Sequence, residues 1–206
     1  MPLALVTCGP AYEPIDAVRC ITNHSTGELG AALCAALHSA GFRVLCLRGE
    51  MATHPAPQNV AVIPFSTNSS FAEELEKLPV APDVIFHAAA LCDFTVDGAT
   101  GKKIRSDAGL TLTLRPTEKL LSHLRPLFPE ALIVGWKYEL EGSREEVVSR
   151  ARSQISHART DACVVNGSAY GDGFGLIESG SPDVLPFADK AALSAYLTQW
   201  AQEKPR

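Results

Sequence analysis

The chain has 206 residues, with 18 Lys or Arg against 23 Asp or Glu, and its formal net charge at pH 7 is −5. This length suffices for one α/β core or two small ones without disulfides or a structural metal. The acidic balance argues against a general nucleic-acid-binding protein, and no apolar run is long enough to span a membrane. Because the first residues lack the basic region of a signal peptide, we expect a cytoplasmic protein.

The cysteines show no recognisable disulfide or metal-binding pattern. Cys8, Cys20, Cys34, Cys46, Cys92 and Cys163 are scattered through apolar segments. No pair has C-x-x-C spacing, and none lies near a histidine in a zinc-ligand pattern. We interpret them as small buried thiols in a reducing compartment.

The first half of the chain alternates short apolar runs with helical patterns. Residues 3–7 are a predicted buried strand that ends at Gly9. Residues 25–40 are a predicted helix, because Ser25 and Glu28 have capping-box spacing and Gly41 can end it. Further strands are expected at 43–47, 60–63 and 84–90, and a short helix at 71–78.

The second half continues this alternation. We expect a loop from Cys92 to Ala108, a weak strand off the main sheet at 110–114, and a helix that is capped by Thr117 and ends at 127. A strand at 132–135, a charged amphipathic helix at 143–158 and a strand at 162–165 follow. The chain then forms a hairpin at 175–187 and a final helix from the cap Asp189 to 202. Such alternation predicts an α/β fold with a doubly wound, mostly parallel, Rossmann-like sheet and a small antiparallel extension. Without a linker or an internal repeat, residues 1–206 are expected to form a single domain.

Ligands of such sheets bind beyond the carboxyl ends of the strands, and the first strand is followed there by a notable loop. It contains Gly9 and, at the expected helix start, the run Asn23-His24-Ser25-Thr26-Gly27. Backbone N–H groups at a helix start can bind phosphate. Ser25 as a simple helix cap is the alternative explanation.

Two later loops follow strands in the same way. Ala88-Ala89-Ala90 end the 84–90 strand, and Asp93 follows them. Farther along this loop, Lys102, Lys103 and Arg105 form either an anion clamp or a solvated surface loop. Lys137 and Glu139 follow the next strand, as a crevice lining or a weak surface pair. The sequence has no P-loop, no dinucleotide glycine fingerprint, no Tyr-x-x-x-Lys pair and no nucleophile elbow.

A family resemblance follows from several ordered motifs. They are Glu13-Pro14-Ile15-Asp16, Val18-Arg19, Ile21-Thr22-Asn23-His24-Ser25-Thr26-Gly27, Ala88-Ala89-Ala90 with Asp93, Lys103-Ile104, Gly135 with Lys137 and Glu139, Asp161 with Asn166, and Gly173-Phe174-Gly175. Together they resemble phosphopantothenoylcysteine synthetase, also called phosphopantothenate–cysteine ligase. That enzyme often forms the C-terminal half of a bifunctional coenzyme A biosynthesis flavoprotein.

The resemblance implies a two-step ligation. CTP or ATP activates the carboxylate of 4′-phosphopantothenate as an acyl-nucleotidylate with release of pyrophosphate, and the amine of L-cysteine then forms the amide. Mg²⁺ (or Mn²⁺) is the implied metal. A homodimer is implied, and the absence of the decarboxylase half implies a ligase without flavin. No nucleic-acid or membrane partner is expected.

The resemblance also implies roles for matching residues. Asn23 would hold the reacting acyl group, and Lys103, on a flexible flap, would stabilise charge on the α-phosphate; both are expected to be catalytic. The expected nucleotide-binding residues are Gly9, Ser25, Thr26, Gly27, Ala88, Ala89, Ala90, Asp93 and Lys137. Arg19, His24 and Asn166 are expected to support the substrate site or the dimer interface. No metal ligand is indicated.

The chain departs from the family pattern at several positions, which are Ala11, Tyr12, Arg105, Ser106 and Gly167. These departures leave open a divergent relative that binds a nucleotide but ligates another acid or lacks catalysis. A separate alternative, an NAD(P)-dependent Rossmann oxidoreductase, is disfavoured by the missing glycine fingerprint and Tyr-x-x-x-Lys pair.

Overall fold

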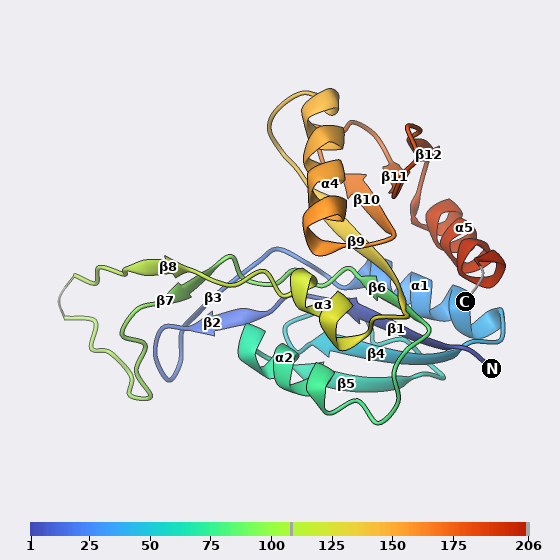
Figure 1. Cartoon of the computed structure of the whole chain (residues 1–206). Coiled ribbons are helices and arrows are strands. Elements are labelled where there is room, and N and C mark those ends of the chain that lie inside the picture. Colours follow the sequence, from blue (N-terminus) through green and yellow to red (C-terminus); the bar gives the residue numbers. More distant parts are fainter. Residues whose placement is uncertain (108, 205–206) are drawn as a thin grey trace.

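The computed structural model describes residues 1–107 and 109–204, so the expected loop end at Ala108 lies outside the described residues. An eight-stranded sheet forms its centre (Figure 1). In chain order its strands are β1 (Leu3–Cys8), β4 (Arg43–Gly49), β5 (Ala61–Phe65), β6 (Val84–His87), β9 (Leu132–Tyr138), β10 (Ala162–Asn166), β11 (Phe174–Glu178) and β12 (Leu185–Phe187).

The strand order across the sheet is β12-β11-β10-β9-β6-β1-β4-β5. All neighbours from β10 to β5 pair in parallel, and β11 and β12 extend the sheet antiparallel beyond β10. The predicted α/β sheet with a small antiparallel extension is therefore confirmed. The order of the strands reverses between β1 and β6, which is the switch point where such sheets bind ligands.

Helices cover both faces of this sheet (Figure 1). They are α1 (Glu28–Ser39), α2 (Asn68–Glu76), α3 (Leu121–Leu127), α4 (Arg144–Ala158) and α5 (Lys190–Glu203). α1 packs against α5, β1 and β4 on one face, whereas α3 and α4 contact each other and β9 on the opposite face. Gly30 lets α1 approach closely, because a Cβ there would lie 2.2 Å from the Cβ of Cys8.

Two small antiparallel sheets project beyond the carboxyl ends of the main strands (Figure 1). One pairs β2 (Tyr12–Pro14) with β3 (Cys20–Thr22), and the other pairs β7 (Phe94–Val96) with β8 (Leu114–Pro116). Thr95 joins them by donating a 2.8 Å hydrogen bond to Glu13. We call residues 12–22, 94–107 and 109–116 the arm.

Several local predictions are confirmed. The helix expected at 143–158 is α4, and the expected cap Asp189 accepts from the N–H of Ala192 at the start of α5. A capping box of Ser143 and Glu146, which was not predicted, begins α4. The expected hairpin is formed by β11 and β12. All six cysteines are free, and five are buried, but Cys20 is exposed, contrary to expectation.

Other local predictions were wrong in their boundaries. α1 begins at Glu28, and its N-cap is Gly27 with no side-chain cap, so Ser25 forms no capping box. The helix expected to start at a Thr117 cap is α3, which begins only at Leu121. Thr117 does not cap it, because the Thr117 hydroxyl donates to the carbonyl of Cys92. The expected strand 110–114 is displaced to β8, whose partner β7 was not predicted.

The expected strand 84–90 also ends early, because β6 stops at His87. The residues after β6 still run beside the segment that follows β1, because Ala90 forms an isolated parallel bridge with Pro10. Among the described residues, no helix is long and apolar enough to cross a membrane.

Candidate functional site

The carboxyl end of β1 and the start of α1 meet in a close backbone contact. Gly9 and Gly27 have left-handed φ values of +77° and +80°, which strongly favour glycine. A Cβ on Gly27 would lie 3.6 Å from the Cα of Gly9. We call this place the cradle, formed by Gly9 and residues 25–27. Backbone N–H groups at the start of a twelve-residue helix suit it to bind an anion.

Asn23 links this region to the segment that follows β6. Its side-chain Nδ2 donates to the carbonyls of Ala90 (3.2 Å) and Leu91 (2.9 Å). The reversed amide would set Oδ1 against two carbonyl oxygens, so these contacts decide the orientation of the amide. Oδ1 is thereby left as the atom that can face a ligand. His24, the next residue, is exposed.

Backbone hydrogen bonds hold the Ala88–Ala90 segment beside the loop after β1. Ala90 donates to the carbonyl of Gly9 at 3.0 Å, and Ala11 donates back to the carbonyl of Ala90 at 3.1 Å. The Thr7 hydroxyl lies 2.8 Å from Nδ1 of His87 and accepts from the N–H of Ala89 at 3.2 Å. The two segments therefore form one continuous wall.

His87 is enclosed beneath this wall. Burial lowers the pKa of its imidazole to about 4, because the charged form would lose its hydration. Phe71 packs against the ring, with centroids 5.4 Å apart. His87 is therefore a neutral part of the core at pH 7.

Asp93 follows the wall and is exposed. Its carboxylate pairs with Lys119, which the sequence did not single out, and the two side chains are 65% and 71% exposed. An ion pair this exposed adds little stability. It does place a cation next to the aspartate expected at the nucleotide.

Lys103 lies on the arm, where a buried carboxylate anchors the neighbouring residue. Asp16, whose side chain is 0% exposed, pairs with Arg19 at 2.5 Å. Asp16 also accepts from the N–H of Ile104 at 3.1 Å, and Arg19 donates to the Ile104 carbonyl at 3.2 Å. The N–H of Val18 first, and those of Ile104 and Arg19, hold the pKa of Asp16 below its usual value. The side chain of Lys103 is exposed beyond this anchor.

Lys137 and Asn166 lie at the ends of the adjacent strands β9 and β10. Glu139 lies between Lys137 (3.3 Å) and Arg150 (2.8 Å) and donates its N–H to the Asn166 carbonyl. Gly167 is required here, because its φ is +110° and a Cβ would lie 2.2 Å from the Glu139 carbonyl oxygen. Any side chain at position 167 would therefore meet the backbone of Glu139.

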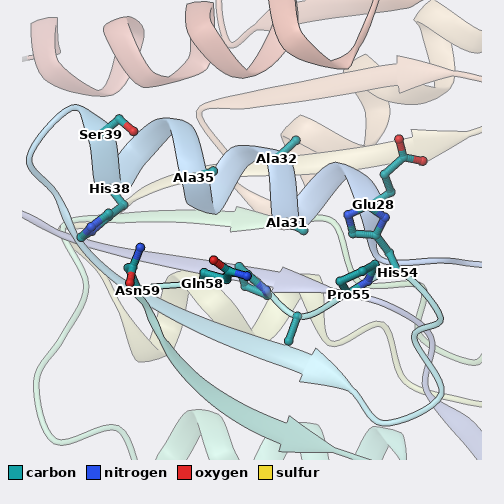
Figure 2. Close-up of a pocket in the computed structure, with 12 residues that line it drawn as sticks. Glu28, Ala31, Ala32, Ala35, His38, Ser39, His54, Pro55, Gln58 and Asn59 are labelled. Atoms are coloured by element: carbon teal, nitrogen blue, oxygen red, sulfur yellow. The ribbon is translucent and has the colours of Figure 1, made fainter.

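The structure thus brings Gly9, Asn23, Gly27 and Ala90 together, and it holds Lys103 and Lys137 in separate clusters. A groove of about 470 Å³ lies beside the cradle, between α1 and residues 54–59 (Figure 2). None of the predicted site residues lines it. Sequence reasoning missed Asp16 as an anchor and Lys119 as a partner of Asp93, because each pairing joins distant segments.

The fold and this site define the class of protein: a Rossmann-like α/β protein with a candidate anion site at the switch point of its sheet. The chain matches the family described as "DNA/pantothenate metabolism flavoprotein C-terminal domain" over residues 3–192. It belongs to that family, which confirms the resemblance seen in the motifs.

Known relatives support the same assignment. The coenzyme A biosynthesis bifunctional protein CoaBC of Thermococcus kodakarensis is 35% identical over 162 residues, which are 79% of this chain and 40% of that protein. For CoaBC of Bacillus subtilis the identity is 29%, over 95% of this chain and 50% of that protein. The chain therefore spans half the length or less of these relatives.

Solved structures share the fold. The DNA/pantothenate metabolism flavoprotein from Streptococcus pneumoniae has a TM-score of 0.85 at 23% identity, with 98% of this chain and 99% of that chain covered. A Cab2 mutant in complex with phosphopantothenate-cysteine has a TM-score of 0.75 at 16% identity, with 98% and 85% covered.

Proposed function

We propose that this chain is a phosphopantothenate–cysteine ligase. The carboxylate of 4′-phosphopantothenate attacks the α-phosphate of CTP or ATP, which expels pyrophosphate and forms an acyl-nucleotidylate. The amine of L-cysteine then attacks the acyl carbon, forms the amide and releases the nucleoside monophosphate. Family membership supports this proposal. The observation that carries it is the Asn23 amide, which donates to the carbonyls of Ala90 and Leu91 beside the cradle.

The nucleotide is proposed to bind along the wall, with phosphate at the cradle. Ser25, Thr26 and Gly27 offer backbone N–H groups there, and Ala88–Ala90 present small side chains that let a ribose or base lie against the backbone. Asp93, with Lys119, and Lys137 lie farther along the strand ends. His24 and Asn166 border the same edge of the sheet.

Mg²⁺ (or Mn²⁺) is proposed to be held by the phosphates. No group of three or more His, Cys, Asp or Glu side chains suited to a metal occurs in residues 1–107 and 109–204. Mg²⁺ in nucleotide sites keeps several waters and few protein ligands, so this composition fits its usual binding. When bound, the ion offsets charge on the triphosphate.

Asn23 is proposed to act in the second step. Because both of its Nδ2 hydrogens face carbonyls, its Oδ1 is free to accept from the cysteine amine and orient that amine toward the acyl carbon. The acyl-holding role that the family implies would need Nδ2 to leave these carbonyls, because only Nδ2 can donate to an acyl oxygen. Lys103 is proposed to stabilise charge on the α-phosphate when the arm closes.

A homodimer is proposed, with the arm as the contact surface. Phe94, Leu110, Leu112 and Leu114 on the arm are each 37–50% exposed. A second copy would bury these side chains and bring the flap of one protomer to its partner's site. Light scattering of Leu112→Asp should then show a loss of dimer, and an unchanged mass would contradict this surface.

The decisive experiment supplies 4′-phosphopantothenate, L-cysteine and Mg²⁺ with either CTP or ATP and measures pyrophosphate release. Release with either nucleotide, together with the amide product by mass spectrometry, is expected. Nucleotide binding without release identifies a divergent relative instead. We further propose that residues 1–206 form one domain and that the protein is cytoplasmic, which suits six free thiols.

A further inference from the structure

Arg48, near the end of β4, places a guanidinium group beside the cradle. A Cβ on Gly27 would lie 3.6 Å from Nη1 of Arg48, the same distance as from the Cα of Gly9. The ends of β1 and β4 and the start of α1 therefore meet at one cation. Neither a motif nor the family resemblance pointed to this residue.

The positive charge of Arg48 is held in place but is not neutralised. Its Nη2 donates to the backbone carbonyls of Ala52, at 3.0 Å, and His54. Both acceptors are uncharged, and none of the ion pairs of the described residues includes Arg48. The acidic residue in the first turn of α1, Glu28, pairs with Lys190 at 2.5 Å.

The same loop also holds the start of α1. The N–H of His54 donates to the carbonyl of Thr26 at 2.9 Å. Figure 2 shows Glu28 and His54 at one end of the groove beside α1. The guanidinium and the helix start are thus fixed relative to each other by short backbone contacts. This fixation reduces the entropy lost when both bind one ligand.

We propose that Arg48 is a further binding residue of the site and that its Nη1 donates to a phosphate oxygen of a substrate held at the cradle. This inference rests on the proposed function. The protein carries a net charge of −5, so a polyanionic substrate needs a local cation. An unpaired guanidinium beside the N–H groups of a helix start supplies one, and its planar fork suits phosphate oxygens.

The test compares Arg48→Gln with Arg48→Lys and with Arg43→Gln, an exposed arginine at the opposite end of the same strand. Calorimetry measures the Kd of ATP, CTP and 4′-phosphopantothenate, and of the matching compounds without phosphate. Arg48→Gln should weaken binding of at least one phosphorylated ligand by roughly 10- to 100-fold, as expected for loss of a charged hydrogen bond. Arg48→Lys should lose less, and Arg43→Gln should not change binding.

The ligand that loses affinity identifies whose phosphate Arg48 contacts, the nucleotide's or the acid's. Affinity should also depend less steeply on salt in Arg48→Gln than in the unaltered protein. Equal losses of affinity for phosphorylated and unphosphorylated compounds, or no loss at all, would overturn the inference. Arg48 would then only hold the loop that contains Ala52 and His54. If the unaltered protein releases no pyrophosphate while Arg48→Gln still loses phosphate binding, the ligase proposal fails and the role of Arg48 stands.

Discussion

The carboxylate of Asp16 accepts a hydrogen bond from the backbone N–H of Ile104 at 3.1 Å, across 88 residues of sequence. Ile104 directly follows Lys103, the lysine proposed to act on the α-phosphate. The buried carboxylate therefore ties the base of the arm's flap to the loop that carries Arg19 and Asn23. Asp16 does not contact Lys103, but it limits the positions that the Lys103 side chain can reach.

Asp16→Asn should slow the first half-reaction through this anchor. The amide cannot accept from Val18, Arg19 and Ile104 as a charged carboxylate does, so Lys103 becomes less well placed. We expect kcat for pyrophosphate release to fall by roughly 10- to 100-fold. Asp107→Asn removes an exposed carboxylate from the same loop and should leave kcat unchanged. Equal rates in the two variants would contradict the anchoring role.

Lys103→Gln should abolish the first half-reaction, because its charge is the one proposed for the α-phosphate. Pyrophosphate release without cysteine measures this step alone. The control is Lys102→Gln, which removes the same charge from the adjacent exposed residue. Normal release in Lys103→Gln would remove the lysine from the mechanism.

Asn23→Asp should make the acyl-nucleotidylate accumulate. A carboxylate has no Nδ2 to donate to Ala90 and Leu91 and would repel their carbonyl oxygens, so the side chain turns away and the amine loses its acceptor. Mass spectrometry of quenched reactions should detect the intermediate. Gln58→Glu adds the same charge at an exposed position and should show no accumulation. Unchanged turnover in Asn23→Asp would refute the assigned role.

Because His87 is buried in its neutral form, we expect the folded protein to lose stability in mild acid. Its folded pKa, about 4, lies below the ordinary value of 6.5, so the unfolded chain binds more protons between these pH values. Stability is therefore complete above pH 6.5 and falls as the pH decreases toward 4, by about 2 kcal/mol between pH 7 and pH 5.

Urea unfolding at both pH values tests this dependence. The difference should shrink in His87→Gln, which cannot titrate, and should persist in His38→Gln, which lacks an exposed histidine. A slope that is the same in all three proteins would show that other groups cause it.

Gly167→Ala should destabilise the end of β10 more than Gly171→Ala. Both glycines have left-handed φ values, +110° and +106°, but only at Gly167 would a Cβ meet backbone, 2.2 Å from the Glu139 carbonyl oxygen. The backbone strain is shared, so the clash alone separates the variants, by about 1–3 kcal/mol. Thermal or urea unfolding measures this difference. Equal stabilities would mean that Glu139 moves aside without cost.

The sequence by itself determined the class of the fold, because strands and helices are encoded in local patterns. Each such pattern lies within one short stretch of sequence, as the apolar run of β1 and the amphipathic spacing of α4 show. The same holds for the cap at Asp189. Motifs after the strands also located Gly9, Asn23 and Ala88–Ala90, since parallel strands end at one edge of the sheet.

Only the tertiary structure decided which of these residues meet. The start of α1 is set by Gly27, which must approach Gly9, rather than by the hydroxyl of Ser25. The pairing of Asp16 with Ile104 and the position of Arg48 beside Gly27 join segments far apart in the chain. Such contacts carry no local pattern, because they depend on how β1, β4 and α1 pack against one another.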